Sequence, residues 1–157
     1  MTAAATNAAT GTNGGPRQPN PKGWPRISSA IFCEDAAAEI EWLCRAFGFE
    51  MRIRVDGEDG SIVHSELGYG DGLVMVSSAR RFPHWASPRS IGSRNTQSMM
   101  FYVDDARAHC ERARAQGAKI TSEIKLSDYG EEYWADLSYE AEDPEGHRWW
   151  IAQRVRG

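Results

Sequence analysis

A regular pattern of apolar positions divides the first half of the chain into one helix and four strands. Apolar side chains recur at the i, i+3, i+4 and i+7 spacing of a single helical face, at Ile40, Leu43, Cys44 and Phe47. This spacing predicts an amphipathic helix that begins after Asp35, a suitable amino-terminal cap, and ends at Gly48. Short alternating segments between turn residues predict the strands, at residues 26–33, 49–55, 62–68 and 73–77.

The second half of the chain repeats this order of elements. A strand is expected first, then a helix that Asp105 caps and Gly117 ends, and then three more strands. The four strands are expected at residues 98–103, 119–125, 133–140 and 148–153.

The two halves also align residue by residue. Asp35 matches Asp105, and the turn at Asp71-Gly72 is echoed by the turn at Glu145-Gly146. An internal repeat of this kind carries more weight than the pattern of any one segment. The sequence therefore predicts an α+β fold of two βαβββ modules.

The modules are expected to share one domain. Their limits are residues 24–79 and 97–154, within a domain at 26–155, and a linker at 80–96 joins them. Residues 1–25 are rich in Ala, Thr, Asn, Gly and Pro without apolar periodicity, which predicts a disordered tail.

Composition narrows the classes of function. A net charge of −4 argues against nucleic acid as a partner, and no apolar run approaches the length needed to span a membrane. Three cysteines, Cys33, Cys44 and Cys110, lie in apolar segments and are interpreted as reduced core residues. A cytoplasmic protein is expected.

The paired modules resemble a known family in several motifs. GDGLVM closes the first module, YVDDARAHCERARAQGAKI opens the second, and DPEGHRWWIAQ ends it. These residues resemble the glyoxalase/bleomycin resistance/dioxygenase group, the vicinal oxygen chelate superfamily, and its glyoxalase-like, PhnB-like branch in particular. The resemblance implies an eight-stranded incomplete barrel with helices on the outside. It also implies a central cavity, in many members built by a homodimer or by module exchange.

The family's metal positions carry no suitable ligands in this sequence. Metal-using members hold a divalent ion with His or Glu side chains from the first and fourth strand of each module. Counted from the flanking turns, those positions fall on Ser28, Met75, Ser98 and Trp150. Two hydroxyls, a thioether and an indole do not bind divalent ions as carboxylates and imidazoles do. The sequence thus predicts neither the usual metal site nor any other cofactor, and no glyoxalase I or extradiol dioxygenase reaction.

The same strand faces predict a ligand-binding cavity. Alternate residues share a face of a strand, so Trp150 should face the cavity and Trp149 the helices. The predicted lining is aromatic and apolar with a few hydroxyls and one cation: Ser28, Ala30, Phe32, Met75, Ser98, Met100, Tyr102, Arg148 and Trp150. Pockets for small molecules are commonly lined this way, although the same residues can simply fill a core.

Two other groups of residues are candidates. His64 and Glu66 share a strand face and can act as a catalytic acid/base pair or as donors to a displaced metal, or simply form a polar stripe. Tyr129 and Trp134 lie in the acidic, aromatic segment 127–140, which relatives place at the cavity rim. Acidic groups around aromatic walls favour a cationic planar ligand; the alternative is a solvated acidic hairpin.

Three hypotheses follow. The first is a metal-independent binding protein that sequesters a planar or cationic aromatic ligand in a cavity lined by Trp150. The second is a glyoxalase-like lyase or isomerase that uses a non-standard metal site around His64 and Glu66. The third is a homodimerisation module that binds no ligand.

Overall fold

The first module has the predicted βαβββ order. The computed structural model of the protein describes residues 20–157, so most of the predicted tail lies outside the described residues. The elements are β1 (Ser29–Cys33), α1 (Ala36–Trp42), β2 (Glu50–Asp56), β3 (Ile62–Tyr69) and β4 (Gly72–Ser78). A π-helical turn, Leu43–Phe47, continues α1 and ends at Gly48, whose φ of 83° is left-handed. Asp35 caps α1 as predicted, its Oδ1 accepting from Ala38 N at 3.0 Å.

The second module repeats that order. Its elements are β5 (Ser98–Tyr102), α2 (Ala106–Ala115), β6 (Lys119–Asp128), β7 (Ala135–Glu142) and β8 (Arg148–Arg156). Two short 3₁₀ turns, Ala79–Arg81 and Pro88–Ile91, lie in the linker. β6 and β8 run past their predicted ends because both continue to pair with β7. No helix in the described part of the chain is long and apolar enough to cross a membrane.

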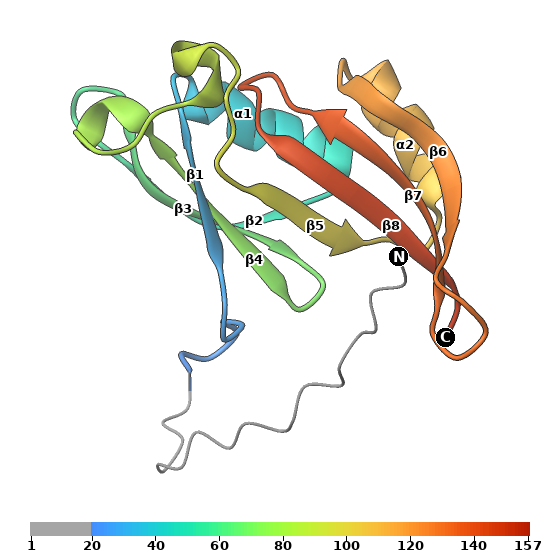
Figure 1. Ribbon diagram of the computed structural model, residues 1–157. Coiled ribbons are helices and arrows are strands. Elements are labelled where there is room, and N and C mark those ends of the chain that lie inside the picture. The colour runs from blue at the N-terminus through green and yellow to red at the C-terminus, as the bar shows by residue number, and fades with distance from the viewer. Residues whose placement is uncertain (1–19) are drawn as a thin grey trace.

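The eight strands form two sheets, each with one parallel pair. The orders are β1-β4-β3-β2 and β5-β8-β7-β6, with β1 parallel to β4 and β5 parallel to β8 (Figure 1). Within the described residues no strand pairing joins the sheets and no closed barrel forms. The two inner edges meet where Gln97 Nε2 donates to Ala30 O at 3.3 Å.

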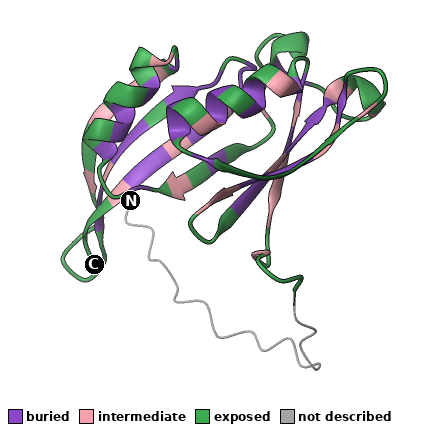
Figure 2. Ribbon diagram, turned by 180° about the vertical axis from the view of Figure 1, so that it is seen from behind, coloured by how far each residue is buried: buried purple, intermediate pink, exposed green. Residues whose placement is uncertain are grey.

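Both helices cover the same side of the molecule and touch each other. They lie behind the strands in Figure 1 and in front of them in Figure 2. Trp42 Nε1 donates to Gln116 O at 2.6 Å, and His109 Nε2 lies 2.9 Å from Phe47 O. The helix side of both sheets meets in one aromatic cluster, made of Phe47, Phe49, Tyr69, Phe101 and Trp149. The two modules therefore share a single core.

A turn of the second module binds the first helix. The Glu145 carboxylate accepts hydrogen bonds from Glu34 N at 2.8 Å and Asp35 N at 3.0 Å, at the amino end of α1. Ser87 Oγ of the linker donates to the same carboxylate at 2.6 Å. A carboxylate at a helix amino terminus satisfies free N–H groups and complements the helix dipole. This contact fixes one end of the junction between the modules.

The same junction buries a second carboxyl group. Glu39 of α1 is 1% exposed and lies near Asp143 and Glu145. Burial, with these two acidic neighbours, raises the pKa of Glu39 far above its usual value. The folded protein therefore keeps a proton on Glu39 that the unfolded chain releases above about pH 4.5.

Glu39→Gln should change how stability depends on pH. Between the unfolded and folded pKa values the folded state binds more protons, so stability falls as pH rises, by up to about 1.4 kcal/mol per pH unit. Glutamine mimics the protonated acid and needs no proton. In urea denaturation, the free energy of unfolding of the variant minus that of the natural protein should therefore increase from pH 5 to pH 8. Glu41→Gln, at an exposed position of the same helix, serves as the control. Parallel stability profiles for the natural protein and Glu39→Gln would contradict this account.

Candidate ligand-binding site

The adjacent tryptophans of β8 point to opposite faces of the second sheet, as predicted. Trp149 is 2% exposed, packs on Phe47 with ring centroids 5.4 Å apart, and donates from Nε1 to Asp143 Oδ2 at 2.7 Å. Trp150 faces away from this core and remains partly exposed. The Asp143 carboxylate also accepts from Glu145 N and His147 N, which fixes the turn that starts β8.

One group of predicted lining residues lies on the first sheet. Ala30, Met75 and Glu66 form a single row across β1, β4 and β3. Phe32 stands at one end of this surface and is covered by Trp85 of the linker, whose ring stacks on it at 5.0 Å. Ser28 directly precedes β1, and its Oγ has no hydrogen-bond partner among residues 20–157.

The other group lies on the second sheet, in three neighbouring rows. The first row is Ser98, Arg148 and Glu142; the second is Met100, Trp150 and Glu140; the third is Tyr102, Ala152 and Ser138. Met100 and Tyr102 are 44% and 45% exposed, so this surface is open.

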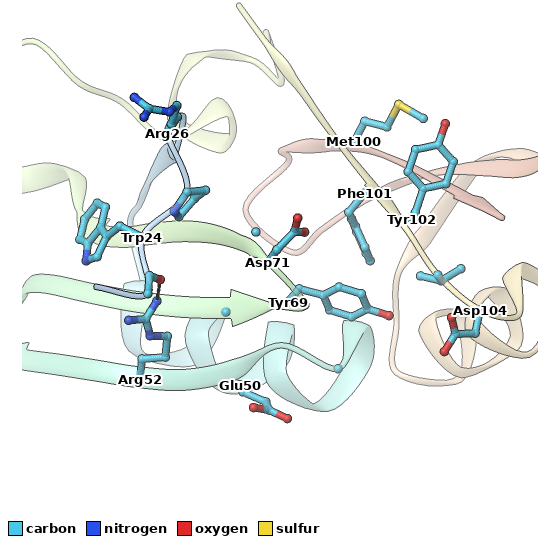
Figure 3. Close-up of a pocket in the computed structure, with 17 residues that line it drawn as sticks. Trp24, Arg26, Glu50, Arg52, Tyr69, Asp71, Met100, Phe101, Tyr102 and Asp104 are labelled. Carbon is cyan, nitrogen blue, oxygen red and sulfur yellow. Dashed lines mark hydrogen bonds between the residues drawn. The ribbon is translucent and has the colours of Figure 1, made fainter. Parts of the chain in front are cut away.

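The clefts between the modules do not unite the two groups. The larger cleft has a volume of about 1340 Å³ and takes Met100 and Tyr102 from the predicted lining. Figure 3 shows Trp24 and Arg26 on one side of it, Tyr102 and Asp104 on the other, and Tyr69 between them. A smaller cleft of about 290 Å³ includes Ser98 and Met100. Neither contains Ser28, Met75 or Trp150, so in one chain the predicted lining is divided between the two sheets and does not surround either cleft.

Tyr102 of β5 and Trp134 of the segment 127–140 both contact the guanidinium of Arg154, a residue that the sequence pattern did not single out. The Arg154 guanidinium lies 5.1 Å from the Tyr102 ring centre and 5.2 Å from that of Trp134. Its Nε donates to Asp136 Oδ1 at 2.6 Å, and its Nη2 to Tyr102 Oη at 2.6 Å. Tyr129 packs against Trp134 with ring centres 5.5 Å apart. The alternation along β8 could have placed Arg154 on this face had the predicted strand extended past residue 153.

The second candidate group offers two donors. His64 Nε2 lies 3.4 Å from Glu66 Oε1, and Arg52 Nη2 lies 3.8 Å from Glu66 Oε2. Within residues 20–157 no three His, Cys, Asp or Glu side chains gather as a metal site requires. Neither set of donors therefore fits the divalent ion of the metal-using relatives. The first set is Ser28, Met75, Ser98 and Trp150, and the second is His64 and Glu66.

Comparison with known proteins identifies the family. The family model described as the Glyoxalase/Bleomycin resistance protein/Dioxygenase superfamily matches residues 26–151. The protein belongs to this superfamily.

Individual relatives share only about a quarter of their residues with this chain, or fewer. An uncharacterized protein of Mycobacterium bovis is 28% identical over 137 residues, which cover 84% of this chain and 85% of the relative. The crystal structure of TioX from Micromonospora sp. ML1 is 25% identical with a TM-score of 0.61, and the match covers 85% of this chain and 98% of TioX. TnmS3, described as an antibiotic binding protein from Streptomyces sp. CB03234, is 16% identical with a TM-score of 0.62, over 83% of this chain and 97% of its own.

The two tryptophans should differ sharply in their contribution to stability. Trp149→Ala removes a buried indole and leaves the Asp143 carboxylate without one of its donors, so we expect a loss of about 3–5 kcal/mol. Trp150→Ala removes a partly exposed side chain and should cost about 1 kcal/mol or less. Guanidinium denaturation measures both values. Equal losses would mean that the β8 register differs from the one described.

Proposed function

We propose that the protein is a metal-independent small-molecule-binding protein of the glyoxalase/bleomycin-resistance type. It holds a planar or cationic aromatic ligand against Trp150. The observation that carries this proposal is the second-sheet surface, where a partly exposed indole stands beside the exposed Met100 thioether. An indole face stacks on flat rings and attracts cations, and a methionine side chain adapts to ligand shape. The fold shared with the antibiotic-binding TnmS3 is compatible with this use.

A homodimer is part of the proposal. The lining of one chain is divided between its two sheets, and a second copy can place the first sheet of one chain over the second sheet of the other. Apolar side chains that stand exposed on these faces support this arrangement: Ile53 and Val55 on the first sheet and Met100 on the second. Exposed apolar groups of this kind mark interaction surfaces. The free cysteines, Cys33, Cys44 and Cys110, suit the reducing cytoplasm.

Binding should depend on Trp150. We expect a panel of planar aromatic compounds, neutral and cationic, to include binders with micromolar dissociation constants by isothermal titration calorimetry. Trp150→Ala should weaken them at least tenfold, because the stacking surface is removed. Leu126→Ala removes an exposed apolar side chain on the helix side of the second sheet and should leave affinity unchanged. Binders that are indifferent to Trp150→Ala would refute the proposed site. A dimer that binds no compound would favour the ligand-free dimerisation module.

A glyoxalase-like lyase or isomerase is the second candidate. The buried Glu66 carboxylate beside His64 is the observation that favours it, because a carboxylate can orient an imidazole for proton transfer.

Metal analysis separates the two functions. We expect protein purified without chelators to carry zinc, nickel, manganese and iron far below one ion per chain in mass spectrometry. Two donors alone hold such ions weakly. Stoichiometric metal that is lost in both His64→Ala and Glu66→Gln would support the enzyme and contradict the binding protein.

A further inference from the structure

The face of the second sheet that displays Trp150 carries an ordered row of charge pairs. Side chains of β7 and β8 that lie directly opposite each other share a face and interact. On this face the opposite pairs are Glu142 with Arg148, Glu140 with Trp150, Ser138 with Ala152, and Asp136 with Arg154. Carboxylates therefore occupy three of the four β7 positions, and two of the three have an arginine opposite.

The two outer carboxylates are neutralised within the chain. Arg148 Nη2 lies 3.1 Å from Glu142 Oε2, and Lys119 Nζ lies 3.5 Å from Glu142 Oε1. Arg154 Nε lies 2.6 Å from Asp136 Oδ1. Both carboxylates are nearly buried, which is tolerable because each has a cationic partner.

Glu140 breaks this pattern. Its neighbour on β8 is Trp150, its neighbour on β6 is Ser122, and Met100 follows Trp150 on β5. The nearby β6 lysines stand in other rows, Lys125 opposite Ser138 and Lys119 opposite Glu142. In the described part of the chain Glu140 forms no ion pair, and its side chain is exposed.

The Arg154 cluster shows what this combination of groups can hold. There a carboxylate from β7 and aromatic rings from neighbouring segments surround a planar cation, the chain's own guanidinium. Glu140 and Trp150 offer the same two kinds of group, a carboxylate and an aromatic face, side by side on the same sheet. Charge-assisted contacts and cation–π contacts act together on such a cation.

We infer that the ligand is a planar aromatic cation and that Glu140 selects for its positive charge. The ring of the ligand stacks on Trp150, and its positive charge lies at Glu140. This inference rests on the proposed binding function and adds to it the charge of the ligand and the residue that selects it. A neutral ring of the same shape stacks on Trp150 without the second contact. Glu140 is therefore a specificity residue, and Trp150 supplies most of the affinity for either compound.

A matched pair of probes tests the charge preference. N-methylquinolinium carries a fixed positive charge, and quinoline is a neutral ring of nearly the same shape at pH 7.5. We expect the natural protein to bind the cation about five- to tenfold more tightly in calorimetry at low salt. The preference should shrink as salt is added, because Glu140 is exposed and its charge is screened.

Variants assign that preference to Glu140. Glu140→Gln should weaken binding of N-methylquinolinium at least threefold and leave binding of quinoline within a factor of two. Glu41→Gln makes the same change of net charge on α1, away from this sheet, and should alter neither affinity. Trp150→Ala should weaken both probes.

The outcomes distinguish a failure of the role proposed for Glu140 from a failure of the proposed binding function. Equal affinity for the two probes, or an unchanged preference in Glu140→Gln, overturns the role of Glu140 while binding on Trp150 stands. Failure of both probes to bind, or binding that Trp150→Ala does not affect, overturns the binding site itself and the inference with it.

Discussion

The turn from Asp143 to His147 is the contact on which the rest of the molecule depends. Asp143 accepts three hydrogen bonds inside the turn and from Trp149, and Glu145 reaches across to the amino end of α1. The first set of bonds fixes where β8 begins, and the second fixes one module against the other. Because successive strand residues alternate between faces, a shift of one residue here would bury Trp150 and expose Trp149. The turn from Asp143 to His147 therefore fixes both the burial of Trp149 in the shared core and the position of Trp150 on the opposite face.

Because the two modules repeat, the turn that precedes β4 can be compared with the turn that precedes β8. Asp71 stands where Glu145 stands in the second module, and Asp104 stands where Glu34 stands in the first. Glu145 binds the start of α1, whereas Asp71 and Asp104 line the large cleft between the modules. Aspartate is one methylene shorter than glutamate, and among residues 20–157 no side-chain hydroxyl donates to Asp71 as Ser87 Oγ donates to Glu145. One junction is closed and the other open because a short side chain and a missing donor remove the contact.

The sequence predicted most of the local structure and less of the site. The modules, the helix caps and the opposite orientation of Trp149 and Trp150 follow from periodicity and from turn residues, which act over a few positions. The ends of β6 and β8 depend on pairing with β7, and the cluster of Arg154, Asp136 and Trp134 depends on those ends. The separation of Met75 from Trp150 depends on how two sheets pack, which strand patterns do not encode. The role proposed for Glu140 depends on Trp150, which lies opposite it on β8, and not on its neighbours along the chain.

The pairing of β7 with β8 leaves out one charge pair at the position of Trp150. An arginine at position 150 would continue the pattern set by Arg148 and Arg154, and cross-strand pairs of opposite charge contribute about 0.2–1 kcal/mol each. The chain instead places an indole opposite an exposed carboxylate that forms no ion pair in the described part of the chain. Departures from an otherwise consistent pattern are expected where a protein binds something. The same reasoning separates the two neighbouring tryptophans: the indole of Trp149 is buried in the shared core, and that of Trp150 lies partly exposed on the opposite face.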